Sequence, residues 1–239
     1  MQPVKEYTFD NFIVGKSNQF AFTAAKAVAD KPGETYNPLL ICGESGLGKT
    51  HLLDAIYNQV SAQLPDASFS SFTADELIKM MVRTFKAELE KMWYADLLSA
   101  DILLIDDIHT LVGKRATQME FVSLLHAFID RGSQVVMTCS VLPLEMPHSD
   151  DTVRNDFNWG LFADIQPLDS ETAKSIILNK AERSGLRLAE DACEYIDNNG
   201  VREIRRIEGI INRLQAQREL MGSFIDLDVV KLICEDSEG

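Results

Sequence analysis

The sequence predicts an α/β protein in which a five-stranded parallel sheet packs between helices and is followed by a small all-helical lid. Two patterns support this fold class. Over residues 1–168, short apolar runs bounded by turn residues alternate with longer helical patterns, which is typical of parallel sheets. After residue 168 the patterns are helical only. We therefore expect an α/β domain over residues 1–168 and a helical lid domain over residues 169–239.

The five expected strands are residues 38–42, 67–72, 101–105, 134–139 and 162–165. The first, third and fourth are continuous apolar runs, which indicates strands that are buried on both faces. Helical patterns over residues 49–64, 74–98 and 118–131 are long enough to connect parallel strands. Helices should therefore cover both faces of the sheet.

Four helices are expected in the lid domain. The first begins after Asp169 or Ser170, either of which can cap it, and ends near Arg183. The other three are expected over residues 189–198, 202–220 and 226–234.

Composition excludes several classes of function. The chain has 37 acidic and 23 basic residues and a net charge of −14, so its surface repels a phosphate backbone and any DNA contact must be local. It has no apolar stretch near the roughly 18–20 residues of a membrane span, and its start lacks the apolar core of a secretory signal. We expect a cytoplasmic protein with no membrane contact. The four cysteines are far apart in the sequence, which predicts buried thiols rather than a zinc site or a disulfide framework.

Residues 43–50, GESGLGKT, match the phosphate-loop pattern GxxxxGK[ST] between an apolar strand and a helix. Glycines allow backbone N–H groups and the helix N-terminus to converge on phosphates. Lys49 is expected to neutralise β- and γ-phosphate oxygens, and Thr50 to ligate Mg²⁺. The expected cofactor-binding residues here are Gly43, Ser45, Gly46, Leu47, Gly48, Lys49, Thr50 and His51.

The apolar run 102–105 ends in Asp106 and Asp107. A nucleotide site of this class needs a second acid for magnesium, and we expect Asp106 in the Mg²⁺ shell. Asp107 is placed to orient or activate the attacking water as a general base. Alternatively, the two aspartates have no role in binding and simply form the solvent-exposed end of a strand. His109 could polarise the same water, although a loop histidine is more often structural.

Five segments together resemble the AAA+ domain of the DnaA family of bacterial chromosomal replication initiators. They are residues 7–21, 36–39, 46–53, 103–108 and 157–161, and the resemblance extends over residues 7–232. It implies a P-loop AAA+ domain that binds ATP or ADP, carries a helical lid and assembles nose to tail at replication origins. It also implies that Ile13, Val14 and Asn18, in the opening segment of residues 7–21, line the adenine pocket. The alternative is that the side chains of this segment only pack against the domain.

The resemblance also implies that Arg205 reaches the γ-phosphate from the lid. Aligning Ile207, Glu208 and Gly209 with the family's sensor 2 helix gives Arg205 this position. A guanidinium there couples the nucleotide state to the lid. Arg202 and Arg206 are expected on a solvated basic face, which is the alternative reading for Arg205 as well.

Two positions depart from the family at its catalytic machinery. Asp156 stands where the initiator has its trans-acting arginine finger, and a carboxylate would repel a neighbour's γ-phosphate. This argues against ATP-bridged self-assembly. Ser140 stands where the family has an acidic sensor 1 residue, so we expect at most slow ATP hydrolysis.

Two further departures concern DNA. Residues 92–98, MWYADLL, replace the basic cluster expected in the family's insertion that grips single-stranded DNA. This helix also carries a methionine and aromatic stripe, which consists of Met80, Met81, Phe85, Leu89, Met92 and Trp93. The stripe is either a packed face or a docking patch for a protein. No helix-turn-helix segment for duplex DNA follows before Gly239. DNA binding is therefore expected to be weak or absent.

These features lead to a functional expectation. The chain resembles the DnaA and Hda-like group, and we expect an ATP- or ADP-dependent switch that regulates replication initiation with Mg²⁺ as the metal. Its partner would be the initiator or another replication factor. The alternative is the excised ATPase domain of a divergent initiator that binds origin DNA, and a third possibility is an autonomous ATPase.

Overall fold

The computed structural model describes residues 1–84, 95–111, 115–141, 160–199, 201–222 and 225–235. The chain forms two compact units, which we describe separately. The first consists of Met1–Phe12, Phe20–Glu44 and Lys49–Ile165. The second consists of Ile13–Gln19, Ser45–Gly48 and Gln166–Gly239. Two short segments of the expected domain 1–168 therefore group with the second unit.

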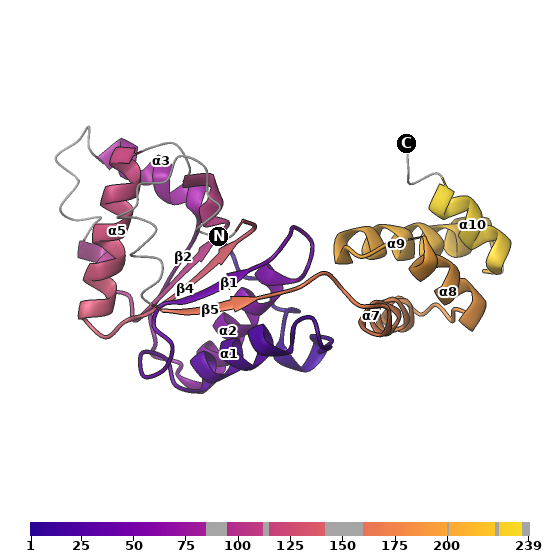
Figure 1. The fold of residues 1–239 in the computed structure, drawn as a ribbon, viewed down its shortest axis with the longest axis horizontal. Helices are drawn as coiled ribbons and strands as arrows, with labels where there is room; N and C mark the ends of the chain where they lie inside the picture. Colours follow the sequence, from indigo (N-terminus) through magenta and orange to yellow (C-terminus); the bar gives the residue numbers. More distant parts are fainter. Residues whose placement is uncertain (85–94, 112–114, 142–159, 200, 223–224, 236–239) are drawn as a thin grey trace. The chain divides into compact units, whose positions relative to one another are not determined.

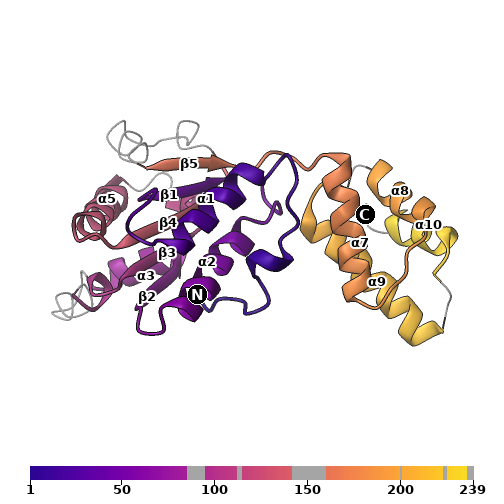
Figure 2. The same cartoon turned by 90° about the horizontal axis from the view of Figure 1, so that it is seen from below.

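The first unit is built on a five-stranded parallel sheet with the strand order β2-β3-β4-β1-β5 (Figures 1 and 2). Its strands are β1 (Leu39–Cys42), β2 (Phe69–Thr73), β3 (Ile102–Asp106), β4 (Gln134–Cys139) and β5 (Leu161–Asp164). Every residue of β1, β3 and β4 is buried, whereas β2 is half-buried because it pairs with β3 alone. The expectation of a five-stranded parallel sheet is confirmed.

Helices cover both faces of this sheet, as Figures 1 and 2 show. The helices α1 (Gln19–Asp30) and α2 (Lys49–Gln63) lie on one face, and α3 (Ala74–Thr84) and α5 (Arg115–Asp130) lie on the other. Alternate residues of a strand point to opposite faces. Leu40, Leu103 and Met137 accordingly pack with Phe121 and Phe128 of α5 in one buried apolar cluster.

Helix α1 was not expected from the sequence. Its buried face consists of Ala21, Ala24, Ala25, Val28 and Ala29, which have the i, i+3, i+4, i+7, i+8 spacing of an amphipathic helix. The stripe is made of small residues, so it lacks the large apolar side chains that marked the other helices.

The expected helix over residues 74–98 is described only in part. Helix α3 is described as far as Thr84, and residues 95–98 are helical. Of the methionine and aromatic stripe, Met81 is buried in the core, which agrees with a packed face at this position, and Met80 is half-buried. The rest of the methionine and aromatic stripe, residues 85–93, lies outside the described residues.

The second unit carries the four helices that were expected, each within about two residues of its expected bounds. They are α7 (Ser170–Arg183), α8 (Glu190–Asn198), α9 (Ile204–Met221) and α10 (Leu227–Glu235). Asp169 caps α7, because its Oδ1 accepts a hydrogen bond from the N–H of Thr172 at 2.9 Å. Within the described ranges, no helix combines the length and apolar character that crossing a membrane requires.

Candidate functional site

The loop between β1 and α2 has the backbone conformation that its glycines permit. Gly43, Gly46 and Gly48 have φ angles of 150°, 78° and 97°, a region that favours glycine. A Cβ atom at Gly43 would lie 2.6 Å from the carbonyl oxygen of Ile165. The first position of the GxxxxGK[ST] pattern therefore requires glycine for two reasons: its backbone conformation and the lack of space for a side chain.

Lys49 is buried at the base of this loop. Its Nζ donates hydrogen bonds to the carbonyl oxygens of Gly43 and Glu44, both at 2.8 Å, and the residue is 6% exposed. Burial lowers the pKa of the ammonium group, while the carboxylates of Asp107 and Asp106 act in the opposite direction. The cation is thus held between the loop backbone and the two aspartates.

Two threonine hydroxyls hold the carboxylate of Asp106. Thr50 Oγ1 donates to Asp106 Oδ2 at 2.9 Å, and Thr138 Oγ1 donates to Asp106 Oδ1. The β3–β4 register pairs Ile105 with Met137, so Thr138 continues this pairing opposite Asp106. Asp106 is 5% exposed, and both of its oxygens are oriented by neighbours.

Thr138 was not among the expected site residues. Its position in the apolar run 134–139 predicts only that it lies in a strand. Its hydrogen bond to Asp106 forms because β4 lies beside β3 in the sheet, which the sequence alone does not show. Its Oγ1 also accepts a hydrogen bond from the N–H of Asp107 at 2.9 Å. One hydroxyl therefore fixes the two consecutive aspartates.

Asp107 turns toward solvent beside a histidine. Its φ of 61° lies in the left-handed region, and its side chain is 46% exposed. Its Oδ1 lies 3.7 Å from His109 Nδ1, which also accepts a hydrogen bond from the N–H of Ser140 at 3.4 Å. Asp107, His109 and Ser140 thus gather where β3 and β4 end.

The donor set at Thr50 and Asp106 suits Mg²⁺. A hydroxyl and a carboxylate are hard oxygen ligands, and Mg²⁺ commonly uses one or two protein groups together with phosphates and water. Over the described residues there is no group of three or more His, Cys, Asp or Glu side chains that could form a protein-only metal cage. The residues fit a metal that arrives with a nucleotide.

The opening segment contains a turn that Asn18 holds together. Its Oδ1 accepts from the N–H of Gly15 at 2.9 Å, and its Nδ2 donates to the carbonyl of Ile13 at 3.0 Å. Asn18 is 1% exposed, whereas Ile13 is half-buried and Val14 is 43% exposed. Of the three expected adenine contacts, Asn18 shapes the turn and the other two present apolar side chains.

His51 binds the opening segment. Its Nε2 lies 2.9 Å from the carbonyl oxygen of Thr8, and its ring stacks on Tyr7 with 4.6 Å between ring centroids. Phe12 packs edge-on against the same imidazole. The expected cofactor-binding residue His51 therefore connects the start of α2 to residues 7–12.

The same face of α2 continues with Asp54 and Asn58. Asp54 Oδ2 accepts from the N–H of Val4 at 3.0 Å, and Asn58 Nδ2 donates to the carbonyl oxygens of Val4 and Tyr7 at 3.0 and 2.7 Å. Asp54 is 1% exposed, and its Oδ1 has no hydrogen-bond partner among the described residues. Burial raises the pKa of this carboxyl to about 6.

Arg205 contacts the loop within the second unit, to which both Ser45 and α9 belong. Its Nη1 donates to Ser45 Oγ at 3.3 Å, and the N–H of Ile204 donates to the carbonyl of Gly46 at 2.8 Å. Arg202 was expected on a solvated face; its side chain is 35% exposed, and its guanidinium pairs with the buried carboxylate of Asp197. The two arginines therefore have different partners.

Some expected site residues are not placed. Asp156, at the arginine-finger position, lies outside the described residues, as do residues 92–94 of the insertion.

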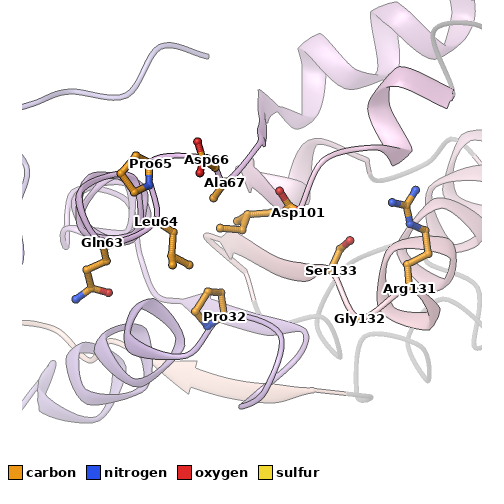
Figure 3. Close-up of a pocket in the computed structure, with 11 residues that line it drawn as sticks. Pro32, Gln63, Leu64, Pro65, Asp66, Ala67, Asp101, Arg131, Gly132 and Ser133 are labelled. Carbon is orange, nitrogen blue, oxygen red and sulfur yellow. The ribbon is translucent and has the colours of Figure 1, made fainter.

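A separate pocket of about 520 Å³ lies at the amino ends of β3 and β4 (Figure 3). Its lining includes Leu64, Asp101, Arg131 and Ser133. Asp101 and Ser133 immediately precede β3 and β4, whereas the loop follows the carboxyl end of β1. The pocket is therefore not part of the expected nucleotide site.

Comparisons with known proteins agree with this geometry. The family model "Bacterial DnaA ATPase domain" matches residues 4–164. A chromosomal replication initiator protein DnaA of Geobacter metallireducens is 38% identical over 231 residues, which cover 97% of this chain and 51% of that protein. This chain spans about half the length of the curated relatives it matches.

Two solved structures are similar over most of the chain. Domain III of the Thermotoga maritima replication initiation protein DnaA is 35% identical with a TM-score of 0.91, covering 99% of this chain and 98% of that one. A replication initiator DnaA bound to AMPPCP and single-stranded DNA is 30% identical with a TM-score of 0.82. That match covers 91% of this chain and 69% of the other.

Proposed function

Because this chain belongs to the family of the bacterial DnaA ATPase domain, we propose that it binds ATP and ADP and acts as a nucleotide-dependent switch in replication initiation or its regulation. The observation that carries the proposal is the connected set of Lys49, Thr50 and Asp106 at the phosphate loop. The initiator structure that contains AMPPCP supports a nucleotide as the ligand.

Each residue of the loop has a role in this proposal. Backbone N–H groups of residues 43–48 bind phosphate oxygens, and Lys49 exchanges its carbonyl partners for the β- and γ-phosphates. Thr50 and Asp106 hold Mg²⁺, which neutralises charge on the phosphate oxygens when it is bound. Ile13, Val14 and Asn18 shape the adenine side of the site.

Hydrolysis is proposed to be slow. Asp107 is exposed and orients an attacking water, with His109 as its neighbour. Ser140 can hydrogen-bond a water but brings no charge to the transition state. Arg205, whose guanidinium already contacts Ser45, reads the γ-phosphate and relates nucleotide state to the helical lid.

The proposed partner is a replication initiator or another replication factor, and DNA binding is proposed to be weak. The net charge of −14 supports weak DNA binding, because counterion release requires basic contacts. Asp156 in place of an arginine finger argues that the chain offers no finger to a neighbour. The alternative function is the ATPase part of a divergent initiator that binds origin DNA, which the initiator structure with single-stranded DNA favours.

Equilibrium binding of a fluorescent ATP analogue with Mg²⁺ tests the nucleotide site. Lys49→Ala is expected to weaken binding by at least about 100-fold, since it removes a charge-assisted contact to phosphate. Lys79→Ala, at an exposed lysine of α3, is the matched control and should bind normally. Unchanged affinity of the Lys49 variant would refute the assignment. Fluorescence anisotropy with a single-stranded oligonucleotide then separates the two functions, because tight ATP-dependent binding supports the initiator alternative.

A further inference from the structure

Two of the four cysteines, Cys42 and Cys139, are register partners at the carboxyl ends of β1 and β4. Both belong to the same buried apolar cluster, so their side chains lie on one face of the sheet. Register partners on adjacent parallel strands have Cα atoms about 4.8 Å apart. This spacing lies inside the roughly 4.4–6.8 Å that a disulfide spans. The backbone therefore holds two free thiols at a separation that a disulfide can bridge.

The two thiols are in contact and chemically unequal. The Cys42 thiol donates a hydrogen bond to Cys139 Sγ, and the Cys139 thiol donates to the carbonyl of Val141. The bond between the thiols raises the pKa of Cys42 and lowers the pKa of Cys139. Burial raises the pKa of both thiols, whereas the Lys49 ammonium favours the thiolate of both. Because the thiolate is the nucleophile in thiol oxidation, we expect Cys139 to react first.

The pair is linked to the phosphate loop by hydrogen bonds. The N–H of Gly43 donates to the carbonyl of Cys139 at 3.1 Å. The carbonyl of Gly43 in turn accepts from Lys49 Nζ at 2.8 Å. A disulfide between Cys42 and Cys139 would therefore form directly before the first glycine of the loop, and hydrogen bonds link it to the lysine expected to bind phosphate.

We propose that Cys42 and Cys139 are a peroxide-sensitive dithiol whose reversible disulfide lowers the affinity of the phosphate loop for nucleotide. The Cys139 thiolate attacks one oxygen of hydrogen peroxide, the O–O bond breaks, and a sulfenic acid and one water form after protonation. The Cys42 sulfur then attacks the Cys139 sulfur and expels hydroxide, which leaves as a second water with the Cys42 proton. Two thiols lose two electrons in total, and a dithiol reductant reverses the reaction.

A first experiment tests whether the disulfide forms and requires no measurement of nucleotide binding. The whole chain is treated with hydrogen peroxide, its free thiols are alkylated, and its peptides are analysed by mass spectrometry without reduction. We expect a linked peptide of Cys42 and Cys139 from protein that keeps its native circular dichroism spectrum. In Cys42→Ser, a cyclic diketone should trap the sulfenic acid at Cys139, whereas in Cys139→Ser residue 42 should stay a thiol. A linked peptide that is absent, or that forms only in unfolded protein, would overturn the proposal.

The effect on nucleotide affinity rests on the proposed function and has its own measurement. Affinity for the fluorescent ATP analogue should fall about tenfold on oxidation, return with dithiothreitol, and stay constant in peroxide-treated Cys42→Ser. Linked protein with unchanged affinity would overturn the switching role. If the reduced protein binds no nucleotide, the proposed function fails, and the linked peptide still decides whether the disulfide forms.

Discussion

Replacing Asp54 with Asn tests how the buried face of α2 responds to pH. Asp54 is 1% exposed, its Oδ2 accepts one backbone hydrogen bond from Val4, and its Oδ1 has no partner among the described residues. A charged carboxylate in this environment has lost most of its hydration. The neutral amide keeps the shape and the acceptor for the Val4 N–H, and it removes the charge.

The expected magnitude follows from the pKa. Burial raises the pKa of Asp54 from 3.8 to about 6. A group whose folded pKa is raised binds protons more tightly in the native state, so stability is lost as pH rises from about 4 to about 6. A pKa shift of about two units means that the ionised carboxylate destabilises the folded wild type by about 3 kcal/mol. The asparagine variant removes this cost but leaves an unpaired amide N–H, which destabilises the variant by about 1 kcal/mol. Asp54→Asn should therefore be about 2 kcal/mol more stable than wild type at pH 8, and no more stable at pH 4.

Thermal unfolding followed by circular dichroism between pH 4 and pH 8 measures this difference. A gain of about 2 kcal/mol corresponds to a melting temperature about 4–8 °C higher for a chain of this size. Other titrating groups contribute to both proteins and cancel in the difference. Asp66→Asn, at an exposed carboxylate, is the control and should follow wild type. An Asp54 variant that parallels wild type across this pH range would refute the reasoning.

Three further predictions concern single contacts. Thr138→Val should reduce Mg²⁺-dependent ATP affinity about tenfold because Asp106 loses a hydroxyl donor, whereas Thr138→Ser should bind normally; equal affinity of both variants in calorimetry would contradict this. Arg205→Ala should weaken ATP binding about tenfold and leave ADP binding nearly unchanged, with Arg213→Ala as control; equal loss for both nucleotides would exclude γ-phosphate sensing. Asp169→Ala should cost about 1 kcal/mol by uncapping α7, and a melting temperature equal to that of wild type would show that the cap contributes nothing.

Much of the first unit could be predicted from the sequence because its signals are local. The apolar runs that became β1, β3 and β4 are buried at every position, and the phosphate loop stands between a strand and a helix as its pattern requires. The family resemblance was carried by short motifs in a fixed order, and the comparisons confirm it.

What the sequence did not reveal depends on contacts between distant segments. Thr138 is one polar residue in an apolar run, and its bonds to Asp106 and Asp107 exist only because β4 lies beside β3. The environment of Asp54 likewise depends on residue 4 passing over α2. Helix α1 was not predicted for a different reason: its buried face consists mainly of alanines, which mark an amphipathic helix less clearly than large apolar side chains do.

Helix α2 also sets a constraint on how this chain can change in length. Thr50 faces Asp106, while His51, Asp54 and Asn58 bind the opening segment from a different side of the same helix. Each residue of an α-helix advances the direction of the side chains by about 100°. A single insertion between residues 51 and 54 would rotate Asp54 and Asn58 away from Val4 without moving Thr50. Residues 50–58 must therefore keep their exact count, and the positions between them are buried or half-buried as well.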